Sequence, residues 1–251
     1  MDSVFLREIQ WRAIPEDRSA YPWSLPALHA LDRLPFPRAV TFFAGDNGTG
    51  KSTVLEALAG ACGFNVEGGS RNHQFATAQA PDLFGSSLRL VWNRKVAHGF
   101  FFRAESFFEF ASQLDAMAAE PGNSPEEVYR PYGNQSLHRR SHGESFLALF
   151  THRLASVSPS LYLFDEPEAA LSPVGQMALL RIMHQWEASG RVQVIAASHS
   201  PILLSYPGAA IYDFDRHPVS AVRLEDTAAY FVTRSFLDNP QGMLHALFAE
   251  E

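Results

Sequence analysis

The chain has 251 residues, 46% of them hydrophobic and 19% charged, which excludes a disordered chain and suits one large α/β domain. A formal net charge of −7 argues against a broad nonspecific nucleic-acid surface, so a nucleic-acid partner stays open but is not supported by charge. The single cysteine, Cys62, excludes an internal disulfide. The first residues lack a secretory signal, and no window approaches the roughly 18 apolar residues that span a membrane. We therefore expect a cytoplasmic protein with no membrane insertion.

Strand-like and helix-like stretches alternate along the chain. In the first part of the chain we expect an edge strand with loops at 1–38, a buried strand at 38–44, a helix at 51–62 and loops at 63–85. Two strands of a small antiparallel layer follow at 87–92 and 97–103, then a helix at 107–119 and a surface linker at 121–132. The last part has a helix at 143–157, a buried strand at 161–164, a helix at 173–189, a buried strand at 191–197, short strands at 210–214 and 221–224, and two closing helices. This order predicts an α/β fold with a mostly parallel sheet flanked by helices. We expect one domain over 1–251, with about 63–140 forming an inserted antiparallel and helical subdomain.

The strongest motif follows the first buried strand and opens a helix. The run Gly45-Asp46-Asn47-Gly48-Thr49-Gly50-Lys51-Ser52 fits the pattern GxxxxGK[ST] of a P-loop. Its glycines let the backbone wrap a phosphate, and the helix N-terminus favours an anion. We expect Lys51 to reach the β- and γ-phosphates of ATP and the hydroxyl of Ser52 to ligate Mg²⁺. The expected nucleotide-binding segment includes the next residue, Thr53.

A second motif ends another apolar strand with two carboxylates. In Leu161-Tyr162-Leu163-Phe164-Asp165-Glu166-Pro167, Asp165 occupies the place of a Walker B aspartate, which would hold Mg²⁺ through water. Glu166 would lie beside the γ-phosphate and polarise the attacking water. We expect Glu166 to be the catalytic base.

The segment Ser141-His142-Gly143-Glu144-Ser145 precedes a helix about 20 residues before Asp165. With the P-loop and the Walker B strand, it resembles the ATP-binding-cassette (ABC) superfamily, whose signature reads Leu-Ser-Gly-Gly-Glu in its SMC-like branch. Ser141, Gly143 and Glu144 match, whereas His142 replaces a glycine. The resemblance implies that these three residues of one subunit cap the γ-phosphate held by a second copy. Segments 67–72, 101–108 and 141–147 look like stand-alone predicted AAA/ABC-type ATPases related to SMC-like and OLD-type heads.

Two further segments resemble parts of the same family. Ala169-Ala170-Leu171-Ser172-Pro173 is similar to its D-loop, and Ser172 is also expected to cap a helix that starts with Pro173. His199 follows a buried strand and resembles the switch histidine, which contacts the γ-phosphate. The resemblance thus assigns catalytic roles to Lys51, Glu166 and His199.

Two features stay open in the sequence. The family's Q-loop residue, which senses Mg²⁺ and water, is either Gln74 or lies in the Arg103–Glu105 region, which we favour slightly. The base of ATP stacks on Tyr21 or Trp23, or these rings simply pack on the sheet.

The resemblance implies an enzyme that hydrolyses ATP with Mg²⁺ and forms an ATP-dependent homodimer with composite sites. It would act on a protein or nucleic-acid partner that the sequence does not identify. Two alternatives remain: the nucleotide-binding subunit of a membrane transporter, and a nucleotide-gated regulatory switch with little turnover. The intact Glu166 argues against the switch.

Overall fold

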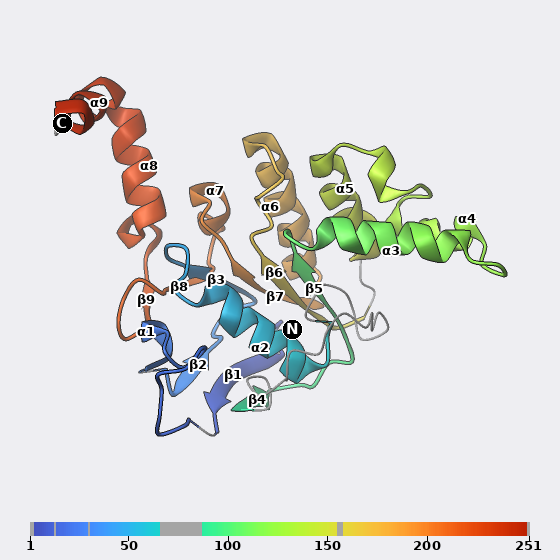
Figure 1. The fold of residues 1–251 in the computed structure, drawn as a ribbon, viewed down its shortest axis with the longest axis horizontal. Coiled ribbons are helices and arrows are strands. Elements are labelled where there is room, and N and C mark those ends of the chain that lie inside the picture. Colours follow the sequence, from blue (N-terminus) through green and yellow to red (C-terminus); the bar gives the residue numbers. More distant parts are fainter. Residues whose placement is uncertain (1–2, 13, 30, 66–86, 155–157, 250–251) are drawn as a thin grey trace.

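The computed structural model describes residues 3–12, 14–29, 31–65, 87–154 and 158–249. In this part of the chain two β-sheets are combined with helices that lie on both sides of the larger sheet (Figure 1). The helices are α1 (Pro26–His29), α2 (Lys51–Cys62), α3 (Phe107–Ala119), α4 (Pro125–Tyr129), α5 (His142–Ala148), α6 (Pro173–Ala188), α7 (Pro201–Leu204), α8 (Ala228–Asp238) and α9 (Pro240–Ala249).

The larger sheet has the strand order β5-β6-β7-β3-β8-β9. Its strands are β3 (Val40–Ala44), β5 (His98–Arg103), β6 (Ser160–Asp165), β7 (Val192–Ala197), β8 (Ala210–Asp213) and β9 (Ser220–Val222). The pairs from β5 to β8 are parallel, and β9 is antiparallel to β8. A parallel sheet collects the carboxyl ends of its strands at one edge, where α/β proteins bind ligands. This confirms the predicted α/β fold.

A smaller antiparallel sheet has the order β2-β1-β4, formed by β1 (Leu6–Trp11), β2 (Arg33–Pro35) and β4 (Leu88–Trp92). One buried side chain of the larger sheet joins the two. The amide of Gln193 on β7 accepts from the N–H groups of Phe5 and Leu6 at 2.9 and 2.7 Å and donates to the carbonyl of Leu6 at 2.8 Å. Both the oxygen and the nitrogen of this buried amide are thereby hydrogen-bonded to the backbone at the start of β1.

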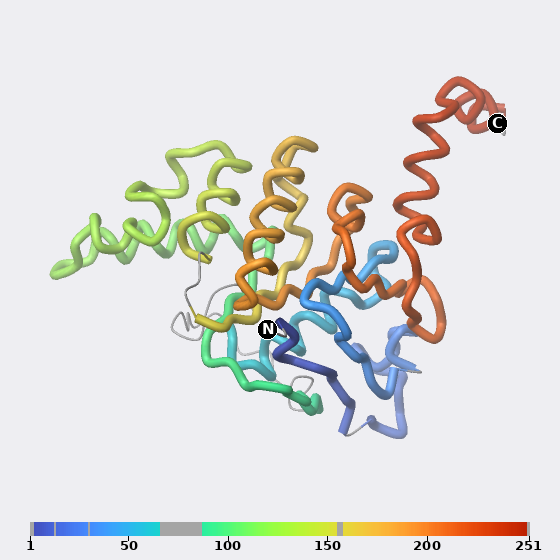
Figure 2. The backbone as a smooth tube through the Cα atoms, turned by 180° about the vertical axis from the view of Figure 1, so that it is seen from behind, coloured from blue at the N-terminus to red at the C-terminus, as the bar shows by residue number. Residues whose placement is uncertain are grey.

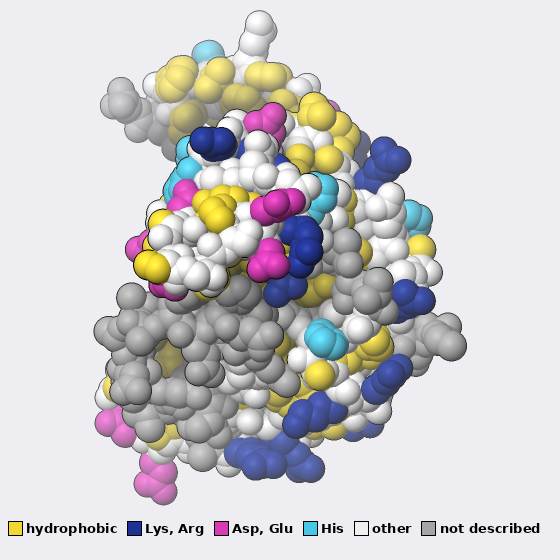
Figure 3. Space-filling model, turned by 90° about the vertical axis from the view of Figure 1, so that its right-hand side faces the viewer, with side chains coloured by type: hydrophobic (Ala, Val, Ile, Leu, Met, Phe, Trp, Pro, Cys, Tyr) yellow, Lys and Arg dark blue, Asp and Glu magenta, His cyan; other side chains and the backbone are white. Residues whose placement is uncertain are grey.

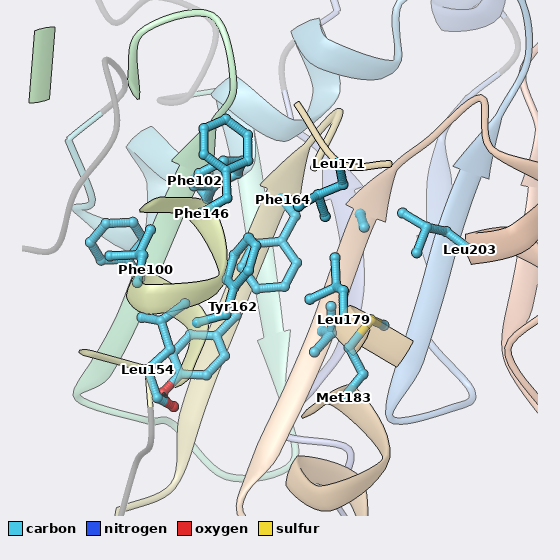
Figure 4. Packing of buried hydrophobic residues seen from close by; sticks show 14 of the residues in the cluster. Phe100, Phe102, Phe146, Leu154, Tyr162, Phe164, Leu171, Leu179, Met183 and Leu203 are labelled. Atoms are coloured by element: carbon cyan, nitrogen blue, oxygen red, sulfur yellow. Dashed lines mark hydrogen bonds between the residues drawn. The ribbon is translucent and has the colours of Figure 1, made fainter. Parts of the chain in front are cut away.

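Alternate residues of the larger sheet enter two hydrophobic cores. Phe42, Phe102 and Phe164 belong to one core together with side chains of α3, α5 and α6. Figure 4 shows Phe102 and Phe164 in this core with Phe146 of α5 and Leu179 of α6. Phe43 and Phe101 point the other way, toward α2 and the small sheet. Because neighbouring strand residues face opposite sides, a strand covered on both faces is expected to be mostly apolar, as β3 and β6 are.

Three expectations about local structure were wrong. The strand expected over 97–103 does not join the antiparallel layer, because β5 pairs in parallel with β6 at the edge of the larger sheet. The expected linker at 121–132 contains α4 and a 3₁₀ turn, Arg130–Tyr132. The helix expected to run to 157 is regular only over α5 and continues as a π-helical turn, Leu149–Arg153. A hydrophobic strand pattern does not reveal which neighbour completes its hydrogen bonds.

The last two helices rise away from the sheets (Figures 1 and 2). Large hydrophobic side chains are exposed on them: Phe231, Val232, Phe236, Leu237, Met243, Leu247 and Phe248. In Figure 3 hydrophobic side chains gather in the distant part of the molecule at the top, whereas the lobe of α3 and α4 in front mixes acidic, basic and hydrophobic side chains. None of the helices in the described ranges combines the length and the apolar character that a bilayer crossing requires.

Candidate functional site

The predicted P-loop connects β3 to α2. Gly45, Gly48 and Gly50 all have positive φ, at 135°, 78° and 103°. A Cβ atom on Gly45 would lie 3.1–3.2 Å from atoms of Phe214 and Asp215. Both the positive φ and these close neighbours therefore disfavour a side chain at this position. The Asp215 carboxylate accepts from the N–H of Asp46 at 2.8 Å and fixes the start of the loop.

Lys51 is the first residue of α2, and only 4% of it is exposed. Its Nζ donates to the carbonyls of Gly45 and Asp46 at 2.9 and 2.7 Å, so the ammonium lies folded against the loop. Burial lowers the pKa of Lys51, while the charge of Glu166 acts in the opposite direction. This buried cation, held only by neutral carbonyls, favours an anionic ligand within the loop.

Ser52 and Asp165 present paired oxygens beside the P-loop. The Ser52 hydroxyl donates to Oδ1 of Asp165 at 2.9 Å. Asp165 is the last residue of β6 and is buried; burial raises its pKa to about 6, and the hydrogen bond from Ser52 opposes this rise. A hydroxyl and a carboxylate at this distance are the oxygen donors that Mg²⁺ uses alongside substrate phosphates.

Glu166 and His199 approach each other from neighbouring strands. Glu166 follows β6 and His199 follows β7, and His199 Nε2 lies 3.4 Å from Glu166 Oε1. Glu166 has φ of 50°, and its N–H donates to the carbonyl of Ala197 at 3.1 Å. A non-glycine residue in this left-handed region is uncommon and often occurs at functional sites. The two side chains are partly exposed, and Glu166 lines the pocket at the P-loop.

Arg103 ends β5 directly opposite Asp165 in the register of the parallel pair. Its guanidinium contacts Glu56 at 3.0 Å, Glu105 at 3.1 Å and Asp165 at 3.8 Å. Of the two Q-loop alternatives, the Arg103–Glu105 region therefore contacts the Walker B carboxylate. Gln74 lies outside the described residues, as do 67–72 of the resemblance.

A pocket of about 270 Å³ opens at the P-loop. Its lining consists of Tyr21, Leu25, Asn47, Gly48, Gly50, Lys51, Ser52, Thr53 and Glu166. Tyr21 is 68% exposed, and its hydroxyl lies 3.0 Å from Oγ1 of Thr53. Trp23 instead packs edge-on against Trp11, with ring centroids 5.4 Å apart. The tyrosine, and not the tryptophan, thus lies at the pocket.

The signature-like segment lies elsewhere. Ser141 precedes α5, and the Glu144 carboxylate accepts from its N–H at 2.9 Å and its hydroxyl at 2.7 Å. Ser141 and Glu144 are exposed and do not line the P-loop pocket. Figure 1 shows α5 in the lobe of α3 and α4, apart from the start of α2. Gly143 packs closely, since a Cβ there would lie 3.2 Å from the carbonyl of Ala170 in the D-loop-like segment.

The D-loop-like segment leads into α6. The Ser172 hydroxyl accepts from the N–H of Gly175 at 3.2 Å, and Pro173 is the first helical residue, as predicted. This confirms the helix cap.

Sequence reasoning missed three carboxylates near these residues: Glu56, Glu168 and Asp215. Glu56 could have been found, because it lies four residues after Ser52 and so shares a face of α2 with it. Asp215 follows β8, whose carboxyl end meets that of β3. Glu168 had no signal of its own, because its partners come from residues 198–200.

Comparisons with known proteins match different parts of the chain. Residues 128–205 match the family described as "AAA domain, putative AbiEii toxin, Type IV TA system", and residues 28–98 match a second AAA domain family. The hemin import ATP-binding protein HmuV of Burkholderia thailandensis is 28% identical over 66% of this chain and 71% of its own length. The xylose import ATP-binding protein XylG of Moorella thermoacetica is 27% identical over 69% of this chain, but only 37% of its own length is covered.

The fold has solved counterparts as well. The structure of cbiO1 from Clostridium perfringens, part of the ABC transporter complex cbiONQ, superimposes with a TM-score of 0.50 at 15% identity, covering 97% of this chain and 99% of that one. At this identity the likeness concerns the fold. The sequence matches to ATP-binding proteins and the fold agree with the P-loop between β3 and α2, and the chain is similar to ABC-type P-loop ATPases.

Proposed function

We propose that this ATPase hydrolyses ATP with Mg²⁺ in composite sites, each formed between two copies of the chain. The observation that carries the proposal is that the P-loop residues and the signature-like segment lie in separate parts of the structure. Lys51, Ser52 and Glu166 line one pocket with the P-loop, and Asp165 is bonded to Ser52, whereas Ser141 lies in a separate lobe. A second copy could bring the missing part to the open side of the pocket.

The P-loop residues would bind the triphosphate. Gly45 to Thr53 supply the loop and the helix N-terminus, and Lys51 would exchange its two carbonyl partners for phosphate oxygens. Tyr21 is placed to stack on the base, since it is exposed at the pocket rim.

Ser52 and Asp165 fit a magnesium ion, since their oxygens already meet at 2.9 Å and one of them is a carboxylate. Ser52 would bind directly and Asp165 through water. The ion would neutralise charge on the phosphates during transfer. Arg103, in contact with Asp165, would serve at the Q-loop position and hold that carboxylate in place.

Glu166 would orient and polarise the attacking water, and His199 beside it would contact the γ-phosphate. Ser141, Gly143 and Glu144 of the second copy would close over the same phosphate. In this arrangement Glu144 first has to release the Ser141 hydroxyl, which it accepts in the single copy.

The test compares the parent with Glu166→Gln at saturating ATP and Mg²⁺. We expect hydrolysis to fall on the order of 100-fold or more, and light scattering to report a dimer only in the variant with ATP. Lys51→Ala is the control and should stay monomeric. Normal turnover by Glu166→Gln contradicts the role of the glutamate, and a monomer with bound ATP contradicts the composite site.

A second candidate is the nucleotide-binding subunit of a membrane transporter, which the names of the relatives HmuV and XylG favour. The measurement is fractionation of the native host extract. Recovery with membranes at high salt supports a transporter subunit, and recovery without membranes supports a stand-alone ATPase acting on another protein.

A further inference from the structure

Glu168 lies in the turn between β6 and α6, two residues after Glu166. Its Oε2 is excluded from solvent and has no hydrogen-bond partner among the residues that the structure describes. Burial raises the pKa of Glu168 and the hydrogen bonds to its other oxygen oppose the rise. Burying a carboxylate with one unsatisfied oxygen lowers the stability of the folded protein unless its other contacts compensate.

Three consecutive residues after β7 donate hydrogen bonds to one oxygen of Glu168. Oε1 accepts from the Ser198 hydroxyl at 2.8 Å, the His199 N–H at 2.6 Å and the Ser200 N–H at 3.1 Å. Hydrogen bonds to a charged acceptor are about twice as strong as neutral ones. One oxygen therefore fixes the backbone on both sides of His199.

The same turn also approaches the side chain of that histidine. Glu166 Oε1 lies 3.4 Å from His199 Nε2, while Glu168 binds the main-chain N–H of His199. The turn itself is closed by hydrogen bonds from Ala169 N to the Glu166 carbonyl and from Leu171 N to the Glu168 carbonyl, at 3.0 and 2.8 Å. One short turn thus contacts both the main-chain N–H and the imidazole of His199.

On the far side, the loop is joined to α6 and α7. The Ser200 hydroxyl donates to the Gln176 side chain at 2.5 Å and caps α7 by accepting from the N–H groups of Ile202 and Leu203. These contacts hold Ser200 but leave the N–H of His199 to Glu168. Without that carboxylate, the N–H of His199 loses the acceptor it has in this structure.

We propose that Glu168 is a positioning residue that holds the loop of His199, and with it the imidazole, beside Glu166. The inference rests on the proposed role of His199 in hydrolysis. Glu168 touches neither nucleotide nor water in this scheme; it acts only through the backbone of residues 198–200. It also links the D-loop-like segment, which follows it, to the histidine.

Glu168→Ala should lower kcat on the order of 10- to 100-fold, the size expected from a displaced active-site group, and change KM for ATP less than about 3-fold. Glu168→Gln keeps an acceptor oxygen and should restore most of kcat. In a His199→Ala background, Glu168→Ala should cause no further loss, because both changes remove the same contribution. Losses that multiply overturn the proposal, and so does a Gln variant as impaired as Ala while its thermal unfolding matches the parent.

A measurement without nucleotide separates this inference from the proposed function. The Cε1–H NMR signal of His199 can be identified among the ten histidines by its loss in His199→Ala. It should shift in folded Glu168→Ala and stay near the parent position in Glu168→Gln. An unchanged signal in Glu168→Ala overturns the positioning role whatever the kinetics. A shifted signal with normal hydrolysis by His199→Ala supports positioning and contradicts the catalytic role of the histidine.

Discussion

Ser52 and Asp165 are 113 positions apart in the chain, yet the hydroxyl of one donates to the carboxylate of the other at 2.9 Å. Ser52 lies in the first turn of α2, which starts at the carboxyl end of β3, and Asp165 is the carboxyl end of β6. The parallel sheet brings these ends to one edge. The proposed magnesium ligands are therefore in contact before any nucleotide binds.

The burial of Asp165 predicts a pH-dependent stability. Its pKa rises from 3.8 to about 6 in the folded protein, so the native state binds more protons than the unfolded state between these values. The nucleotide-free protein should lose stability as the pH rises from about 4 to 6, by at most about 3 kcal/mol, since one pKa unit corresponds to about 1.4 kcal/mol. Urea unfolding of Asp165→Asn should show its largest gain over the parent above pH 6 and a vanishing gain near pH 4. The exposed Asp32→Asn is the control, and an equal pH dependence in both variants contradicts the assignment.

Arg103 should set the acid limit of hydrolysis. Its charge lowers the pKa of Asp165, which in the proposed mechanism would be ionised when it holds Mg²⁺. Arg103→Met should therefore shift the acid limb of the kcat/KM profile to higher pH and should also lower the maximum of kcat/KM. Arg223→Met removes an exposed ion pair with Asp226 and should leave the profile unchanged. A lower maximum with an unmoved acid limb would contradict the coupling.

Gly45 and Gly48 should respond differently to alanine. Both have positive φ, which costs a non-glycine residue about 1–2 kcal/mol, but only Gly45 has neighbours within reach of a Cβ atom. In thermal or urea unfolding, Gly45→Ala should therefore lose more than Gly48→Ala. Gly122, also at positive φ and in open space, is the matched control for backbone strain alone. Equal losses at Gly45 and Gly122 would contradict the close approach of Asp215.

Tyr21 should contribute to nucleotide affinity and not to the chemical step. Stacking of a base on an aromatic ring is worth about 1–3 kcal/mol. Tyr21→Ala should raise KM for ATP about 5- to 150-fold with kcat nearly unchanged. Tyr21→Phe should retain the parent KM, because the ring does the stacking and the hydrogen bond to Thr53 does not. A Phe variant as weak as Ala would assign the effect to the hydroxyl.

The last helix should not contribute to the stability of the body. No described side chain of α9 is buried, and its Leu247 and Phe248 are more than 60% exposed. Ending the chain at Asn239 should leave the melting temperature within about 2 °C of the parent, since surface changes usually stay within about 0.5 kcal/mol. A larger drop would show that α9 packs against something in solution.

The sequence by itself determined the motifs and the strands and helices that flank them. A glycine-rich loop between an apolar strand and a helix predicts a P-loop, and an apolar strand ending in Asp165 and Glu166 predicts a second strand end beside it, because the required residue types are local. Local signals also predicted the cap at Ser172, since an N-cap depends on residues within one turn.

Only the tertiary structure decided which residues meet. The pattern of 97–103 predicts a strand, but hydrogen bonding to β6, and not to β4, brings Arg103 against Asp165. The contacts of Glu168 with residues 198–200, and of Asp215 with Asp46, likewise join segments about 30 and 169 positions apart. Such contacts follow from the order of strands in the sheet, which depends on long-range packing and leaves no periodic signal in either segment.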